Sequence, residues 1–308
     1  MRPRDWIEIP LDDWVEAFVK EWLVPNFRPF FQAVKWPVDQ TLNWLETGLL
    51  SIPVLVFVAA VVLIAWRTAG RGVAIFSLLA LLFLDFINVW SETMTTLAMI
   101  ITAVLFCALV GVPIGIAAAR SDRVASTIRP ILDIMQTIPP FVYLVPIVML
   151  FGVGVVPGVI ATIIFALPPI VRLTNLGIRQ VQEELVEAAY AFGSSPRQVL
   201  WDIQVPLALR TIMAGLNQTL MLALSMVVIA ALIGAGGLGL TVYTGLGRLD
   251  VGAAAEGGVG IVLIAIILDR ITQALGQVSP GGQRSLWQTI KSFFTTNDLA
   301  TGSGAAQR

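Results

Sequence analysis

The residues with the most distinctive types and spacing lie in a polar segment between two long apolar stretches. The segment reads Glu-Ala-Ala-Tyr-Ala-Phe-Gly from Glu187 to Gly193 and, after nine more residues, Ile-Gln-Val-Pro from Ile203 to Pro206. Gly193 can end a short helix here, because glycine takes the left-handed conformation without steric cost. The expected small apolar face of that helix consists of Leu185, Ala188, Ala189 and Phe192.

A second short helix is predicted directly after Gly193. Ser195 is placed to be its N-cap, Pro196 to occupy its first turn and Gln198 to complete a capping box. Pro206 is expected to stop it. Two short helices at an angle, with their own hydrogen bonds satisfied, would form a rigid knob that transmits a push. The alternative is a structured loop without a partner.

The composition excludes most catalytic and nucleic-acid-binding classes. The chain is 57% hydrophobic and 13% charged, with mean hydropathy +0.85, which is typical of a membrane protein. Nineteen Lys and Arg residues balance twenty Asp and Glu residues, so nucleic acid is not expected as a partner. The chain has no histidine, and its one cysteine, Cys107, lies in an apolar run. We therefore predict no metal site and no intramembrane enzyme, which would need converging Ser/Lys, His or paired Asp groups.

Seven apolar segments are long enough to span a bilayer, alone or with their flanks. They lie near residues 49–66, 72–90, 93–119, 138–154, 156–176, 211–235 and 257–275. They are too long for barrel strands, and backbone groups in lipid must be satisfied internally, so they should be helices. The sequence therefore predicts an all-α membrane protein with about seven transmembrane helices.

Basic residues set the predicted orientation. With the N-terminus outside, thirteen of the nineteen Lys and Arg residues fall on the cytoplasmic side, so the positive-inside rule favours an N-out, C-in topology. Within residues 1–47, apolar side chains recur at helical spacing from Leu11 to Trp22. This pattern predicts an amphipathic helix that lies on the membrane surface or against the protein. Pro25, Pro29 and Pro37 are expected to break up the chain after this helix.

In this membrane context, the polar segment resembles the cytoplasmic coupling loop of ABC-importer permeases, where the membrane subunit docks on its ATPase. The matching residues are Glu187, Ala188, Ala189, Gly193, Ile203 and Pro206, with Val205 in place of the family's leucine. The likeness runs from about Trp90 to Leu275 and is closest to glycine betaine/L-proline permeases. The stretches that carry it are Arg129–Pro146, Met149–Gly158, Arg172–Ile178, Thr211–Thr219, Ala223–Ala230, Gly234–Gly239 and Leu249–Gly252.

The resemblance implies a type I ABC-importer permease fold and alternating access. The chain would be a translocation subunit without a cofactor of its own, and ATP would be hydrolysed on a cytoplasmic ABC ATPase dimer. The other implied partners are an external or periplasmic substrate-binding protein, a second permease copy in a homodimer, and the lipid bilayer of the bacterial cytoplasmic (inner) membrane. The implied cargo is glycine betaine and proline-type quaternary ammonium osmolytes. Choline, carnitine or another small solute is the alternative.

Hydropathy and the resemblance together divide the chain into four regions. These are an external amphipathic extension (1–47), two peripheral transmembrane helices (48–90), a permease core (91–275) with its coupling loop at 177–206, and a cytoplasmic tail (276–308). No substrate-binding domain is expected in the tail, because a domain needs more than about 50 residues.

Candidate path residues follow from the chemistry of a quaternary ammonium group, which aromatic faces attract. The candidates near helix ends or breaks are Pro139, Pro140, Phe141, Tyr143, Phe165 and Tyr243. The two prolines stand at a span entrance, where they free backbone carbonyls. For each aromatic residue, lipid contact or packing is the alternative. Asp85, near the external interface, is either functional or structural, and Asp269–Arg270 is interpreted as a paired anchor at the inner surface.

Three glycine-containing motifs do not predict chemistry. Gly234–Gly239 satisfies G-x-G-x-x-G, but it follows a membrane helix, so it is interpreted as a flexible external helix end. Ser279–Gln283 faintly resembles the signature of ABC ATPases, and the chain has no P-loop. Gly111–Gly115 is expected to permit close helix packing. The rival class, an ATP-independent channel or secondary transporter, leaves the polar segment unexplained.

Overall fold

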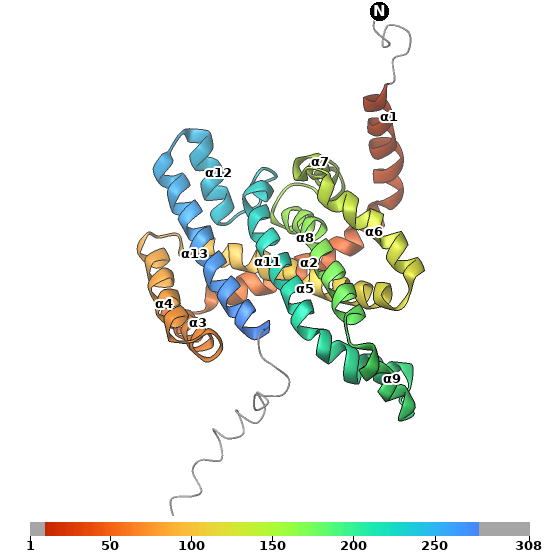
Figure 1. Ribbon diagram of the computed structural model, residues 1–308. Helices are drawn as coiled ribbons and strands as arrows, with labels where there is room; N and C mark the ends of the chain where they lie inside the picture. Colours follow the sequence, from red (N-terminus) through yellow and green to blue (C-terminus); the bar gives the residue numbers. More distant parts are fainter. Residues whose placement is uncertain (1–9, 277–308) are drawn as a thin grey trace, which may run out of the picture. The chain divides into compact units, whose positions relative to one another are not determined.

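The computed structural model describes residues 10–276, and the regular elements within them are all helical (Figure 1). The first elements are α1 (Leu11–Ala17), the π-helical turn η2 (Phe18–Leu23), α2 (Val24–Ser51), α3 (Val54–Ala69), α4 (Arg71–Phe86), α5 (Trp90–Arg120) and α6 (Asp122–Thr137). The remainder are α7 (Pro140–Phe151), α8 (Val155–Arg179), α9 (Glu183–Ala191), α10 (Pro196–Gln198), the π-helical turn η3 (Val199–Gln204), α11 (Val205–Ala231), α12 (Leu238–Arg248) and α13 (Val251–Gly276).

The core consists of α8 and the two helices α5 and α11, which make the two most extensive helix contacts of the described residues with it. Glycines set the distance between α5 and α8, as the sequence predicted for Gly111–Gly115. A Cβ atom on Gly111 would lie 2.4 Å from Cγ2 of Ile170, and one on Gly115 would lie 2.5 Å from Cβ of Thr174. Close approach of this kind is how small residues build helix interfaces in a membrane.

Four helices within residues 10–276 are long and apolar enough to cross a membrane. They are α5, α8, the continuous helix Pro196–Ala231 and α13, and they confirm the predicted spans near 93–119, 156–176, 211–235 and 257–275. The other three predicted spans correspond to shorter helices, namely α3 and α4 with 16 residues each and α7 with 12.

Counting each of two bent pairs as one span raises the total to six, still below the predicted seven. One pair is Pro29–Ser51 with α3, bent by 106°, and the other is α6 with α7, bent by 100°. The predicted span that remains uncounted is the one near 72–90, because α4 has only 16 residues and reaches the length of a span only with its flanks. The prolines at 53, 139 and 140 lie at the two breaks.

The prediction that prolines break up the region after residue 24 is wrong, because α2 is continuous over 28 residues. Pro25 lies in the first turn of α2, directly after the π-helical turn η2. Pro29 and Pro37 lie inside the helix. Packing offsets their lost hydrogen bonds, since α2 lies along α5 and buries Val38 and Leu42.

Polar contacts also attach α2 to the core. Thr95 donates a hydrogen bond to the Glu46 carboxylate (2.8 Å), and Lys35 donates one to the Phe151 carbonyl at the end of α7 (2.9 Å). The part of the N-terminal region formed by α2 therefore lies against the protein. Further towards the N-terminus, Trp14 and Trp22 are exposed.

The glycine-rich turn before α12 is packed rather than flexible. The backbone N–H of Leu238 donates a hydrogen bond to the Thr96 hydroxyl on α5 (2.8 Å). A Cβ atom on Gly239 would lie 2.4 Å from the carbonyl oxygen of Val227 on α11. The turn therefore ties α12 to α5 and α11, at the end of α11 opposite α9 (Figure 1).

Candidate functional site

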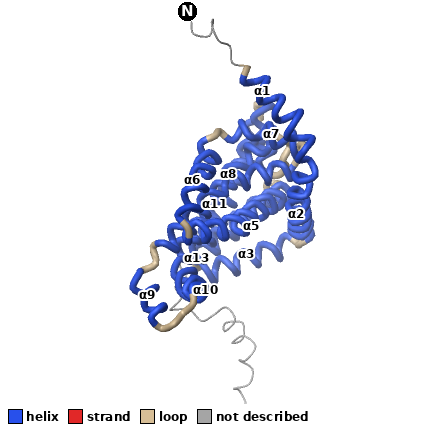
Figure 2. The backbone as a smooth tube through the Cα atoms, turned by 90° about the vertical axis from the view of Figure 1, so that its right-hand side faces the viewer, coloured by secondary structure: helices blue, strands red, loops and turns tan. Residues whose placement is uncertain are grey.

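The polar segment projects beyond the core helices at the end of α8, where α9 and α10 lie (Figure 2). Helix α9 ends as the sequence predicts. Gly193 has φ +82°, and its N–H donates a hydrogen bond to the Tyr190 carbonyl (2.9 Å). The N–H of Ser194 reaches back to the Ala189 carbonyl (3.0 Å). This left-handed residue closes the helix and turns the chain toward α10.

The predicted capping box at the start of α10 is confirmed. The N–H of Gln198 donates to the Ser195 hydroxyl (3.4 Å), and the N–H of Ser195 donates to the Gln198 side-chain oxygen (2.8 Å). Pro196 occupies the first turn. Because these reciprocal bonds satisfy two orphan donors, the corner between α9 and α10 has a fixed geometry.

Pro206 does not stop the second helix, contrary to the prediction. Residues Val199–Gln204 form a π-helical turn that runs directly into α11, and Pro206 lies in the first turn of α11. The N–H of Val205 bonds to the Leu200 carbonyl, five residues earlier. This wider turn accommodates the proline ring, which would otherwise meet the carbonyl four residues before it. The result is one continuous helix from Pro196 to Ala231.

The six matched residues of the segment divide into an outward and an inward group. Glu187, Ala188 and Gly193 are exposed. Ala189 is buried, and Ile203 and Pro206 are half-buried. The predicted single apolar face of α9 is therefore wrong, because Ala189 points inward while Phe192 is 91% exposed.

Three exposed aromatic residues lie in the same segment, namely Tyr190, Phe192 and Trp201. Tyr190 and Trp201 were not among the residues predicted from the sequence to belong to the site. Aromatic residues within a polar, charged segment were the signal that could have identified them, since such side chains are enriched in protein interfaces.

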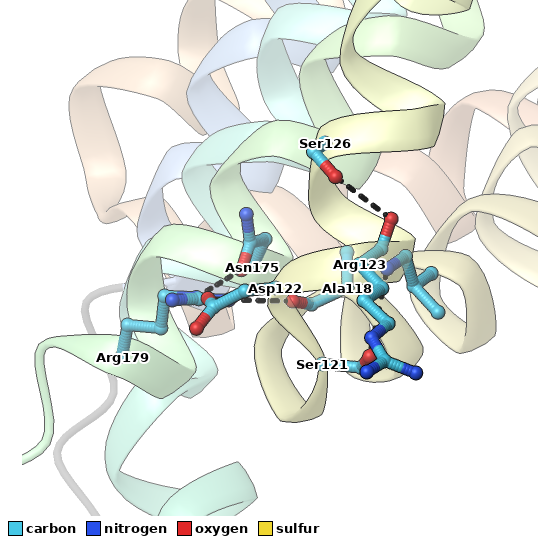
Figure 3. Close-up of polar contacts among 8 residues, drawn as sticks. Ala118, Ser121, Asp122, Arg123, Ser126, Asn175 and Arg179 are labelled. Carbon is cyan, nitrogen blue, oxygen red and sulfur yellow. Dashed lines mark hydrogen bonds and ion pairs between the residues drawn. The ribbon is translucent and has the colours of Figure 1, made fainter.

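The corner between α5 and α6 is joined to α8 through Arg179 (Figure 3). Its guanidinium donates to the Ala118 carbonyl (2.8 Å) and to the Asn175 side chain (2.9 Å), and it pairs with Asp122 (2.7 Å). Ala118 belongs to the last turn of α5, whose carbonyls have no intrahelical partner. Arg179 therefore caps α5 from a neighbouring helix.

A second joint connects α8 to α6. Arg172 pairs with Asp133 (2.5 Å) and donates to the Gln136 side chain (3.1 Å). Together the two joints border a cavity of about 580 Å³ between α5, α6 and α8, near the end that carries the polar segment. The cavity contains cationic and anionic side chains, among them Arg129.

We expect the contacts of Arg179 to be unequal in strength. The Asp122 carboxylate is 91% exposed, so its ion pair is screened by solvent. Asp122→Asn should change the free energy of unfolding by less than about 0.5 kcal/mol. Arg179→Met removes the cap on α5 and should lower the same quantity by about 1–2 kcal/mol. Thermal unfolding of the two purified variants in detergent checks this order, and equal shifts would contradict it.

The predicted helix break at Pro139 and Pro140 is confirmed, since α6 and α7 meet there at 100°. The aromatic path candidates do not form one cluster. Tyr143 and Phe165 both pack against the core cluster around α7 and α8. Phe141 and Tyr243 are exposed, on α7 and α12.

The chain has clear similarity to known membrane transport proteins. Residues 111–278 match the family described as binding-protein-dependent transport system inner membrane component. The chain is 57% identical to the glycine betaine/proline betaine transport system permease protein ProW of Escherichia coli, over 91% of this chain and 79% of that protein. It is 47% identical to the glycine betaine transport system permease protein OpuAB of Bacillus subtilis, over 86% and 94%.

Two further similarities extend this result. The glycine betaine/carnitine transport permease protein GbuB of Listeria monocytogenes is 45% identical, over 87% of this chain and 96% of that protein. Among solved structures, an inward-facing conformation of the MetNI methionine ABC transporter matches with a TM-score of 0.53 and 25% identity, over 63% of this chain and 94% of that chain.

Proposed function

This chain belongs to the family of binding-protein-dependent transport system inner membrane components, and on that premise we propose that it imports glycine betaine and related osmolytes. It is an inner-membrane permease with the type I importer fold. In the proposed mechanism, ATP binding closes a separate ATPase dimer and pushes on the polar segment, here named the coupling segment (residues 177–206). The helices then open outward to receive the cargo, and hydrolysis resets them.

The observation that carries this proposal is the construction of the coupling segment. Its corner is fixed by Gly193 and by the capping box of Ser195 and Gln198, and its second half is continuous with α11. A push on the exposed residues around Glu187 would therefore displace a core helix instead of deforming a loop. The exposed Phe192 and Trp201 are suited to docking on the ATPase.

The names of the relatives support the cargo class. ProW and OpuAB are named for glycine betaine transport, and GbuB for glycine betaine and carnitine. Carnitine shares the quaternary ammonium group, so it remains the alternative cargo together with choline. The external binding protein selects among these solutes, and the permease supplies the passage.

A second copy of the chain completes this passage in our proposal. The bent pair α6–α7 carries an exposed apolar surface on both sides of the break, formed by Ile131, Ile134, Ile138, Phe141, Val142 and Val145. Irregular backbone such as that at Pro139 and Pro140 is tolerated at membrane depth only where protein or a water-filled cavity surrounds it. We place the second copy against this surface, with Phe141 beside the path.

The proposed topology keeps the N-terminus outside and the coupling segment in the cytoplasm. Residues 91–275 are then the permease core, and α3 and α4 are peripheral. The N-terminal extension is external, with α2 braced against the core. Of the proposed tail, residues 276–308, all but Gly276 lie outside the described residues, as does the ATPase-like stretch at 279–283.

Uptake into membrane vesicles tests the proposed function. Radiolabelled glycine betaine is supplied with the binding protein outside and the ATPase and ATP inside, with choline and proline as competitors. We expect ATP-dependent uptake of betaine. If choline alone displaces the labelled betaine in an ATP-dependent manner, the transport mechanism is retained and the cargo is choline. Uptake without ATP would contradict the role of the coupling segment.

A further inference from the structure

A polar cluster joins the membrane helices α11 and α13. The Asn217 amide on α11 donates a hydrogen bond to the Asp269 carboxylate on α13 (2.9 Å). The Thr272 hydroxyl donates to the Asn217 side-chain oxygen (2.6 Å), and the Gln273 amide donates to Asp269 (2.7 Å). Asp269–Arg270 was predicted to be a paired anchor, but the Asp269 carboxylate instead turns toward α11.

We name this cluster the α11–α13 bridge (Asn217, Asp269, Thr272 and Gln273). Its hydrogen bonds form only in one relative position of the two helices. Both ends of the Asn217 amide are engaged, one as donor and one as acceptor. An acidic residue on a membrane helix is costly unless it is bonded, so the contact with Asn217 is difficult to break and re-form during a movement. The bridge therefore favours one fixed alignment of the two helices.

Close approaches of the backbone reinforce the bridge on either side. Toward the end of α13, a Cβ atom on Gly276 would lie 3.0 Å from Cβ of Met213 on α11. Beyond the other end of α11, a Cβ on Gly239 of α12 would lie 2.4 Å from the Val227 carbonyl. A Cβ on Gly257 of α13 would lie 2.8 Å from the Leu238 carbonyl. Helices α11, α12 and α13 are thus in close contact at these three glycines as well as at the bridge.

From this arrangement we infer that α11, α12 and α13 move as one body during transport, with Asn217 and Asp269 as the positioning residues that hold it together. The inference rests on the proposed function. Helix α11 is continuous with the coupling segment, so a push there would move the whole body. The movement would reach the external turn that Leu238 attaches to Thr96.

Exchanging the amide of Asn217 and the carboxylate of Asp269 tests whether these two residues act as a pair. Asn217→Asp places two carboxylates at hydrogen-bond distance, and we expect uptake per ATP hydrolysed to fall about tenfold or more. Asp269→Asn keeps an acceptor for both amides and should lower the ratio only about twofold. The double variant N217D/D269N restores one carboxylate and one amide, and should return the ratio to within about twofold of the unaltered protein.

The measurement uses the complete transporter in proteoliposomes, with radiolabelled glycine betaine and the amount of inserted permease determined for each variant. Rescue by the double variant supports the inference, because it shows that the two residues act as a pair, and the determination of inserted permease separates this effect from a loss of folded protein. An unaffected Asn217→Asp variant, or a double variant no better than Asn217→Asp, overturns it.

A cross-link tests the rigid body without disturbing the bridge. Met213→Cys with Gly276→Cys places two thiols close enough for a disulfide after a small shift, and the native Cys107 is buried. We expect the oxidised protein to retain uptake, with each single cysteine variant as control. Loss of uptake on oxidation that is restored by reduction would overturn the inference. If the transporter without any substitution shows no ATP-dependent uptake, the result instead contradicts the proposed function.

Discussion

Gly193→Val is expected to abolish ATP-driven uptake while the protein remains in the membrane. Gly193 has φ +82°, and a Cβ atom there would meet nothing within 4 Å, so the effect comes from the backbone and not from a clash. The left-handed conformation costs a residue with a Cβ atom roughly 1–2 kcal/mol, and a β-branched residue more. The corner between α9 and α10 would rearrange, and the outward residues of the coupling segment would no longer be presented together.

The matched control is Gly193→Asn, because asparagine tolerates the left-handed conformation. It should retain most of the uptake. Glu187→Arg alters the exposed docking surface without backbone strain and should also uncouple uptake from ATP hydrolysis. Both rates are measured in proteoliposomes with the ATPase present. Normal uptake by Gly193→Val or by Glu187→Arg would show that this segment is not the point of coupling.

Local features of the coupling segment could be predicted because their causes lie within a few residues. A capping box needs only Ser195 and, three residues later, Gln198, and both bonds form as expected. The end of α9 needs only a glycine at position 193. In both cases the hydrogen-bond requirements of a helix end determine the structure, with no contribution from distant contacts.

Features that depend on distant contacts could not be predicted in the same way. Pro206 would end an isolated helix, but here it lies in the first turn of α11, directly after a π-helical turn. Prolines 29 and 37 would disrupt an isolated helix, but α2 is held against α5. Proline chemistry gives the local cost, whereas tertiary packing decides whether the helix continues.

The candidate path residues show a third reason why part of the site could not be predicted from the sequence. Tyr143 and Phe165 pack inside this chain, whereas Phe141 and Tyr243 are exposed. If the passage lies between two copies, its walls are surfaces that one chain leaves exposed. Aromatic residues at helix ends satisfy the chemical requirement equally well in either place, so the sequence cannot separate them. Exposure on the bent pair α6–α7 therefore favours Phe141 over Tyr143.

Gly115→Val should prevent the core from assembling and remove most folded protein from the membrane. A Cβ atom at this position would lie 2.5 Å from Cβ of Thr174 and 2.8 Å from the Val171 carbonyl oxygen. The backbone of α8 cannot retreat easily, because its other side is packed against α11, where Gly215 meets Ile170. Overpacking costs about 1–3 kcal/mol where a core can relax, and we expect the upper end or more here.

Gly258→Val is the matched control, since it makes the same change inside a helix where a Cβ atom meets nothing within 4 Å. Both variants carry the same loss of a helical glycine and the same added β-branched side chain. Only Gly115→Val forces α5 away from α8, so only that variant should lose the folded species in detergent size-exclusion chromatography. Equal yields of folded protein would mean that the α5–α8 contact tolerates separation, and that the core depends chiefly on the packing of α11 against α8.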